Sequence, residues 1–418
     1  MDNAEEIYKA KIERLETAAA AKEPDRVPIG INTTYFPAKY AGVSYHDMFY
    51  DNNKYLEVMT KFARDFNWDG YNSLRSFESV PLGLALAGYD TDLAIGAAVS
   101  SVLAGGAAHD ILADVYSSMP GRELGENVES QFVMDKPVMN PDEYDALIEK
   151  PFEFLMKIVI PRAYKNLAKL DSPAGVGTLL KMGQEIAKFP AFFTEFIGKM
   201  KQEAWTPWYL ALTPNPLDFI GAWLRDFDTL TLDLYRMPEK VKAACEKLAP
   251  VLAAVGKLTG AISKDATGSR RVFCPTWYNT YLSPEQYREF HFPYIKLIVN
   301  ELVDAGFTPL LCFQGRMDHL LDTLTEFPEG KVILWFDKTD LSKVREVVGD
   351  KYCIAGGILS SLLISGTPDQ VKKHMQETLN KYKPGGGYIV STEFNGLGDA
   401  KVANVKAMTE TVMKYGKY

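Results

Sequence analysis

Long apolar runs and paired cysteines are both missing from this sequence of 418 residues. No run of 18 apolar residues occurs, and the Ala-rich stretch 82–108 is interrupted by Asp and Gly, so we expect no membrane span. The four cysteines, at positions 245, 274, 312 and 353, stand far apart and form no CxxC pair, which argues against a disulfide framework and indicates a reducing, cytoplasmic compartment. The N-terminal segment is charged rather than apolar, so we expect no secretion signal.

Blocks of positive charge are also absent. The net charge is -8, and acidic and basic residues are interspersed along the chain. This pattern argues against nucleic acid or an anionic membrane surface as a partner. The glycines at 385–387 could cradle a phosphate, but no Lys-Ser/Thr pair follows them as in a P-loop, so a tight turn is the better interpretation.

The sequence has ample material for one large core, with 47% hydrophobic and 24% charged residues. From residue 287 onward, single apolar segments alternate with helical ones, which is typical of a parallel α/β structure. We therefore predict an α/β fold: one (β/α)8 TIM barrel over residues 1–418, with an N-terminal helix at 2–22 and a helical elaboration at about 134–210. Residues 85–112 have no clear period. The predicted strands are 27–31, 68–71, 271–273, 309–313, 332–336, 352–355 and 387–391.

Two carboxylates follow predicted strands at positions where barrel enzymes gather their catalytic groups. Asp337 ends the wholly apolar strand 332–336; its alternative role is to cap the next helix, for which Asp340 is better placed. Glu393 follows the strand 387–391 in the same way. The two carboxylates could act as general acid and base, or they could bind a metal together with Cys312. Cys312 could equally be a small core residue.

Aromatic residues also follow predicted strands. Tyr35 and Phe36 come soon after the first strand, and Trp277 and Tyr278 follow the strand 271–273. These side chains would form an aromatic pocket for a flat or apolar ligand, although packing against neighbouring helices is the alternative. His319, after Gly315, could face the same mouth, but a helix-surface position fits it better.

Several segments together resemble the uroporphyrinogen decarboxylase superfamily, whose fold is a (β/α)8 barrel. They are spread over most of the chain: EPDRVPI (23–29), LRDFDTLTLDLYRMPEK (224–240), YLSPEQYREFHFPY (281–294), GTPDQV (366–371), PGGGYIV (384–390) and NVKAM (404–408). The superfamily contains decarboxylases and methyltransferases that exchange a methyl group with a separate corrinoid protein. The decarboxylases have an Arg-Gln-Ala-Gly-Arg stretch after the first strand that holds substrate carboxylates, whereas this chain has GINTTYFPAKY, in which Lys39 is the one cation.

The chain therefore resembles the methyltransferase branch, and this resemblance implies a small-molecule methyl donor and a corrinoid (cobalamin) carried on a partner protein. The chain itself lacks the Asp-x-His-x-x-Gly corrinoid motif. Thiol-specific members hold zinc with a His-x-Cys-Gly run and a later Cys; an alignment on Gly315 places Cys312 at the histidine and Gln314 at the first cysteine, and an alignment on NVKAM places Phe394 at the last one. Only one of the three positions, the one with Cys312, therefore holds a candidate zinc ligand, and this does not make that zinc site.

From the residues and the resemblance we expect a methyltransferase, with an aromatic methyl ether as one candidate donor and a role in anaerobic demethylation. Asp337 and Glu393 are the expected catalytic residues, and Cys312 is the one candidate metal ligand. Tyr35, Phe36, Trp277, Tyr278 and Gln314 are expected to bind substrate. A uroporphyrinogen-type decarboxylase and a non-catalytic binding barrel remain as alternatives, and a monomer and a homodimer are both left open.

Overall fold

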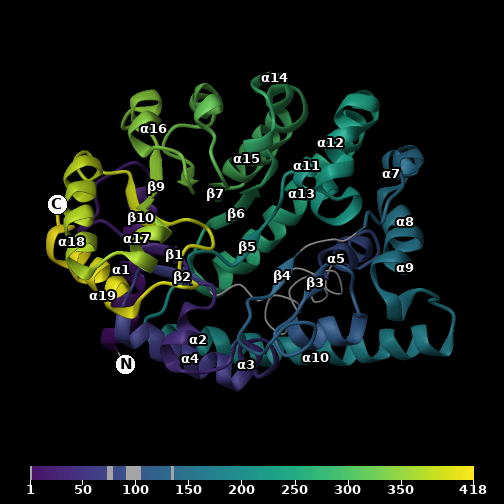
Figure 1. Cartoon of the computed structure of the whole chain (residues 1–418), viewed down its shortest axis with the longest axis horizontal. Helices are drawn as coiled ribbons and strands as arrows, with labels where there is room; N and C mark the ends of the chain where they lie inside the picture. Colours follow the sequence, from purple (N-terminus) through teal and green to yellow (C-terminus); the bar gives the residue numbers. More distant parts are fainter. Residues whose placement is uncertain (1, 73–78, 91–104, 133–135) are drawn as a thin grey trace.

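Eight short parallel strands form the centre of the protein (Figure 1). The computed structural model describes residues 2–72, 79–90, 105–132 and 136–418. Six of the strands make one continuous parallel sheet in the order β10-β9-β8-β7-β6-β5, and β1 pairs with β2. The strands are β1 (Gly30–Asn32), β2 (Gly70–Asn72), β5 (Ala211–Leu212), β6 (Arg271–Thr276), β7 (Thr308–Phe313), β8 (Ile333–Phe336), β9 (Cys353–Ile358) and β10 (Tyr388–Thr392).

The two sheets close into a barrel at two seams. At one seam Ile29 bridges Val390 in parallel, and the Val390 N–H donates to the Pro28 carbonyl at 2.9 Å. At the other, the Tyr71 N–H donates to the Thr206 carbonyl at 3.2 Å, which connects β2 to the segment that leads into β5. All eight strands are thus parallel neighbours in chain order, and the predicted (β/α)8 barrel is confirmed. The short strand β5 has no counterpart among the predicted strands.

The barrel interior holds a core of its own, separate from the core between the strands and the outer helices. Helix α1 (Asp2–Ala19) contributes Leu15, Ala18 and Ala19 to its lower end. Large aromatic rings fill most of the remaining space. The interior residues from the strands and their flanking loops are Trp208, Tyr209, Phe273, Leu310, Cys312, Ile333, Trp335, Cys353, Ala355, Ile389 and Phe394.

Gly30 is the residue that makes room for one of these rings. A Cβ atom at this position would lie 2.5 Å from the ring of Trp208, which is fully buried. We therefore expect Gly30→Ala to lower the free energy of unfolding by about 1–3 kcal/mol, because a packed ring must move. A urea titration would measure the loss. As a control, Gly177→Ala adds a Cβ where no atom lies within 4 Å on a helix and should raise stability by about 0.5–1 kcal/mol.

Helices surround the barrel, and their start signals agree with the sequence. Asp340 caps α16 (Leu341–Val348) by accepting from the Ser342 N–H at 2.8 Å, so the cap predicted for Asp340 is confirmed. Ser283 and Asn140 also cap helical segments, each through a capping box. The main outer elements are α4 (Asn52–Phe66), α13 (Pro238–Thr267), α15 (Phe292–Asp304), the 3-10 segment Asp318–Glu326, α18 (Pro368–Tyr382) and α19 (Val402–Tyr415).

The long connection from β2 to β5 forms a mostly helical insert below and beside the barrel (Figure 1). Its helices are α5 (Val80–Leu86), α7 (Tyr144–Glu149), α8 (Pro151–Phe154), α9 (Ile160–Ala163) and the 30-residue α10 (Pro173–Gln202). A two-residue antiparallel pair, β3 (Ser117–Ser118) with β4 (Gln131–Phe132), lies between them. Residues 91–104 of the Ala- and Gly-rich stretch, and the start of the predicted elaboration at 134, lie outside the described residues. In the part of the chain that is described, none of the helices has the length and hydropathy needed to cross a membrane.

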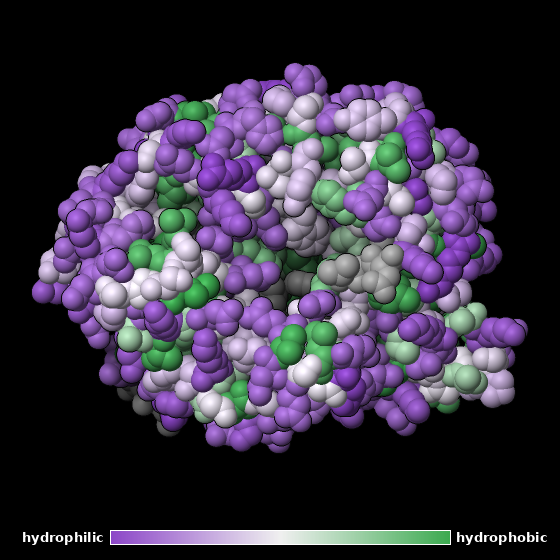
Figure 2. Space-filling model, in the orientation of Figure 1, coloured by the Kyte–Doolittle hydropathy of each residue, from purple (hydrophilic) through white to green (hydrophobic). Residues whose placement is uncertain are grey.

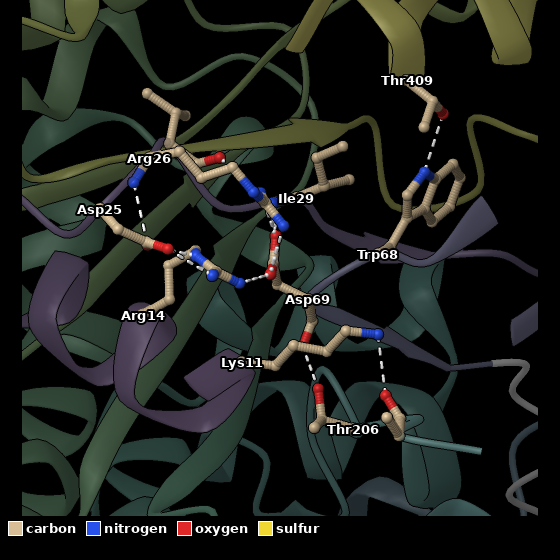
Figure 3. Close-up of polar contacts among 11 residues, drawn as sticks. Lys11, Arg14, Asp25, Arg26, Ile29, Trp68, Asp69, Thr206 and Thr409 are labelled. Carbon is tan, nitrogen blue, oxygen red and sulfur yellow. Dashed lines mark hydrogen bonds and ion pairs between the residues drawn. The ribbon is translucent and has the colours of Figure 1, made fainter. Parts of the chain in front are cut away.

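An ion-pair cluster fastens the N-terminal end of the barrel (Figure 3). Asp69 lies just before β2, is fully buried and accepts from the guanidinium groups of Arg14 and Arg26. The two contacts to Arg26 measure 2.7 and 2.8 Å, and the Ile29 N–H also donates to Asp69, at 2.9 Å. Asp69 therefore connects α1, the entry to β1 and the start of β2. Polar groups at this end of a barrel serve stability rather than catalysis.

Candidate functional site at the barrel mouth

Five polar side chains lie at the C-terminal ends of the strands, above the aromatic interior. Strand residues alternate between the inside and the outside of a barrel. An even number of residues separates three of these side chains from a residue of the barrel interior, so the alternation places them on the inner side as well. Gln314 lies two residues after Cys312, Asp337 two after Trp335, and Glu393 four after Ile389. Asn32 donates through its amide to the carbonyl of interior Phe394 at 3.0 Å. Asn72 completes the set, and we call Asn32, Asn72, Gln314, Asp337 and Glu393 the mouth ring.

The mouth ring consists of three amides and two carboxyl groups, so none of its five side chains is cationic. Its floor is a stack of rings: Tyr209 lies 4.1 Å from Phe273, and Phe273 lies 5.5 Å from Phe394, between ring centroids. Figure 2 shows a hollow near the centre of the face that it draws. A polar rim without cations above aromatic rings is typical of a pocket for a small aromatic or apolar ligand.

Asp337 is the most perturbed acid of the mouth ring. The Phe394 N–H donates to its Oδ1 at 2.7 Å, and the Gly315 N–H contacts Oδ2 at 3.3 Å. Burial raises the pKa of Asp337 to about 6, the two N–H groups partly oppose this rise, and the nearby carboxylate of Glu393 adds to it. A carboxyl group with this pKa is partly protonated near neutral pH and can donate a proton.

Glu393 is only partly buried, and its Oε1 accepts from the Ser360 N–H at 3.3 Å. Because it faces both solvent and Asp337, it is placed to exchange protons between the two. The structure thus brings Asp337 and Glu393 together in one mouth, as the sequence-based interpretation requires.

The raised pKa of Asp337 makes a prediction for stability. Its folded-state pKa of about 6 lies above the ordinary value of 3.8, so the folded protein loses stability as the pH rises from about 4 through 6. Asp337→Asn removes this ionisation. The free energy of unfolding is measured for both proteins at pH 4 and pH 8. We expect the difference between the variant and the wild type to shift in favour of the variant by up to about 3 kcal/mol from pH 4 to pH 8. A stability difference that is the same at both pH values would contradict the raised pKa.

Cys312 lies in the barrel interior and is fully buried. Burial raises the pKa of its thiol well above the ordinary range, and the charge of Asp337 acts in the same direction. Across the described residues, no group of three or more His, Cys, Asp and Glu side chains is arranged to hold a metal ion. The donor set therefore does not fit a resident zinc, and the surroundings of Cys312 match its alternative as a small core residue.

The four aromatic residues singled out from the sequence fall into separate clusters. The ring of Tyr35 lies 4.6 Å from that of Tyr45, between centroids and tilted by 38°, and its hydroxyl lies 2.5 Å from that of Ser130 in the insert. Phe36 is fully buried in the outer core against Phe62 and Phe66. Its ring therefore packs α2 (Phe36–Ala41) against α4 and does not reach the mouth.

Trp277 and Tyr278 are placed by a buried carboxylate. Both of their backbone N–H groups donate to Oδ1 of Asp218, at 2.8 and 2.9 Å. The Tyr278 ring then stacks on Phe227 at 4.7 Å, and the ring of Trp277 lies 5.8 Å from that of Trp223. These two residues thus pack the loop after β6 against the helices that follow β5. His319 is exposed and contacts the Leu282 carbonyl, as expected for a helix surface.

Asn32, Asn72 and Tyr209 are mouth residues that the sequence reasoning missed. A weak signal was available, because β1 and β2 share the pattern Gly-x-Asn: Gly30 and Gly70 face the interior, and an asparagine follows each by two residues. Tyr209 lies in a run of aromatic residues without a recognisable period, so its place in the barrel depends on contacts that only the structure shows.

Residues 218–415 match the family model for uroporphyrinogen decarboxylase (URO-D). This segment contains the five barrel strands β6 to β10, whereas β1, β2 and β5 precede it. This part of the chain, slightly less than half of its 418 residues, is thus similar to the uroporphyrinogen decarboxylase family. A uroporphyrinogen decarboxylase from Chlorobaculum tepidum is 26% identical over 184 residues, which is 43% of this chain and 50% of that protein. One from Coxiella burnetii (strain RSA 493 / Nine Mile phase I) is 24% identical over 216 residues, which is 51% of this chain and 56% of that protein. The chain thus spans about half the length of these curated relatives.

A solved structure of a methyltransferase from Methanosarcina mazei shares the fold over almost the whole chain. The TM-score is 0.61, and the match covers 97% of this chain and 98% of that one. Because only 12% of the residues are identical, this likeness extends to the fold and not to the activity.

Proposed function

We propose that this chain transfers a methyl group from a small methylated substrate, such as an aromatic methyl ether, to the cobalt of a corrinoid on a separate protein. The observation that supports this most strongly is Asp337, a carboxyl group with its pKa raised to about 6, set beside an aromatic floor. An ether or amine must be protonated as it loses a methyl group, and a carboxyl group that is still partly protonated near neutral pH is suited to that step.

In this proposal Asp337 donates its proton to the ether oxygen while the bond between that oxygen and the methyl carbon breaks. The oxygen leaves as a hydroxyl group, and Asp337 is left as a carboxylate that accepts from the Phe394 and Gly315 N–H groups. The partly exposed Glu393 then returns a proton to Asp337 from solvent. The cobalt of the partner supplies the nucleophile that accepts the methyl group. The aromatic floor orients the ring of the donor.

A uroporphyrinogen-type decarboxylase is the second candidate, because the family model and the curated relatives carry that name. A porphyrinogen with several carboxylates needs cationic partners. The mouth ring instead presents Asp337 and Glu393, and Lys39 is half-exposed with its Nζ 4.0 Å from Asp399. The charges at the mouth therefore favour the methyltransferase proposal.

The two candidates are separated by assaying the purified chain with free cob(I)alamin. Methylated ethers, amines and thiols are each added, and the cobalt absorbance change is followed; porphyrinogen turnover is measured in parallel. The proposal expects a change with at least one ether and no porphyrinogen turnover. The absence of any cobalt absorbance change with all three donor classes would contradict the proposal.

A further inference from the structure

Helix α10 has one side that packs on the protein and one side that is exposed. The helix runs along the lower edge of the molecule in Figure 1. Near its C-terminal end Phe196 lies 6.3 Å from Tyr55 of α4, between ring centroids, and Met200 is fully buried. On the other side Leu180 is 67% exposed and Val176 is 46% exposed. Large aliphatic side chains that are exposed together on a long helix indicate a surface that another molecule covers.

The exposed side of α10 has a regular spacing and no charge. Steps of three and four residues separate its members, so they lie along one line of the helix. The six charged residues of α10 all lie off this line. A charge-free face with this spacing is typical of a helix that packs on a second helix. We call it the outer face of α10: Val176, Leu180, Gly183, Ala187, Ala191 and Thr194, all exposed.

Charged residues line one edge of the outer face. Lys181, Lys188 and Glu195 are spaced by seven residues, which places them on the same edge of the helix. Lys188 is compensated within its own chain, because its Nζ lies 2.7 Å from Oε2 of Glu185. Lys181 and Glu195 are exposed, and neither forms an ion pair among the described residues. Two unpaired and opposite charges thus lie equally far from Lys188.

This arrangement of charges is complementary to itself. When a second copy of α10 lies antiparallel, with a two-fold axis at Lys188, each residue faces the one that is equally far on the other side of that position. Lys181 of each copy then faces Glu195 of the other, so the contact forms twice. Glu195 also lines a groove of about 560 Å³ between α4 and α10, which leaves room for the lysine side chain of the second copy.

The shapes agree with the same register. Leu180 of one copy faces the space between Thr194 and Gly198 of the other. This space is open, because a Cβ atom on Gly198 would meet no atom within 4 Å. Near the axis Ala187 is small enough to let the two helices approach closely. The helices would overlap from residue 176 to residue 200, a length of about 36 Å.

We propose that the outer face of α10 is the interface of a homodimer, in which two copies of the helix pack antiparallel about a two-fold axis at Lys188. The occupant is a second copy of this chain because the unpaired charges of the face balance each other across the axis. The interface consists of residues from the insert and none from the mouth ring. The proposal therefore stands independently of the proposed function.

Sedimentation velocity of the full chain at about 2–200 µM tests the proposal. We expect a dimer with a dissociation constant of about 1–50 µM, because one helix pair makes a small interface. Lys181→Glu and Glu195→Lys each turn two attractive contacts into repulsive ones and should raise this constant about tenfold or more. The double variant Lys181→Glu/Glu195→Lys exchanges the charges and should return the constant to within about threefold of the wild type.

Two further variants complete the experiment. Lys373→Glu is the control, since it makes the same charge change at an exposed residue of α18, a helix that lies away from α10 in Figure 1. It should leave the dissociation constant unchanged. Ala187→Arg places a long charged side chain beside the axis and should give a monomer. Far-UV circular dichroism should show all variants folded, because the replaced residues are exposed and the new ones favour helices.

A wild type that is monomeric at about 200 µM would overturn the proposal. Sedimentation of that monomer with phosphatidylglycerol vesicles would then assign the outer face to a membrane surface. A dimer that Ala187→Arg leaves intact uses another surface, and this result would also overturn the proposal. A double variant that dimerises as weakly as either single variant would contradict the register in which Lys181 faces Glu195.

Discussion

Asp337→Asn should lower the rate of methyl transfer by about 10²–10³-fold, the usual contribution of a positioned general acid. Asparagine keeps the shape of the side chain and one oxygen for the Phe394 N–H, but it cannot donate a proton to the leaving oxygen. In the wild type, the rate should be highest below about pH 6 and should fall as the pH rises, because burial sets the pKa of Asp337 near that value. The variant should lose this dependence. Stopped-flow absorbance with cob(I)alamin across pH 5 to about 9 measures both effects.

The matched control for Asp337→Asn is Asp340→Asn. Asp340 lies three residues further along the same loop, is exposed and caps α16 without reaching the mouth. Its replacement should leave the rate and the pH profile unchanged and should cost at most about 1 kcal/mol of stability. An Asp337→Asn variant with wild-type activity would show that the proton comes from another group.

Asp69→Asn should destabilise the protein by about 3–5 kcal/mol, the largest stability effect we expect from a single substitution. The change leaves Arg14 and Arg26 largely buried with their shared carboxylate removed, and an uncompensated buried charge is costly. It also loosens the junction of α1, β1 and β2 (Figure 3). A denaturant titration followed by far-UV circular dichroism measures the loss.

Asp25 provides the comparison for Asp69, because it pairs with the same Arg14 but its side chain is 65% exposed. Asp25→Asn should cost less than about 1 kcal/mol, since solvent screens an exposed pair. Equal losses for the two variants would mean that burial of Asp69 does not determine the strength of the cluster.

The barrel was predictable from the sequence because its strands after Tyr287 are short apolar segments that alternate regularly with capped helices. The strands near 309, 332, 352 and 387 were located to within a residue or two of their observed starts. Strand β5 was missed because it is two residues long and is defined by its pairing with Val272 and Phe273, not by a period of its own. A charged residue that ends an apolar strand, as Asp337 does, can be placed at the barrel mouth from the sequence, because a carboxylate there has no role in the core.

The aromatic pocket was harder to predict. An aromatic residue after a strand can turn toward the mouth or toward the helices, and sequence position does not decide between them. Phe36 turned outward because Phe62 and Phe66 offer it a packed cluster. The rings that do face the interior, such as Tyr209 and Phe394, are brought together by barrel closure between segments almost 200 residues apart. Only tertiary structure brings such residues into contact.

The central claim, methyl transfer from a methyl ether, is tested most directly by following a labelled methyl group. The purified chain is incubated with cob(I)alamin and a methoxyphenol whose methyl group carries deuterium, and the cobalamin is analysed by mass spectrometry. We expect deuterated methylcobalamin together with an equal amount of the demethylated phenol, and a loss of both in Asp337→Asn. Cobalamin that carries no deuterated methyl group would contradict methyl transfer, and decarboxylation of a porphyrinogen supplied in its place would identify the alternative activity.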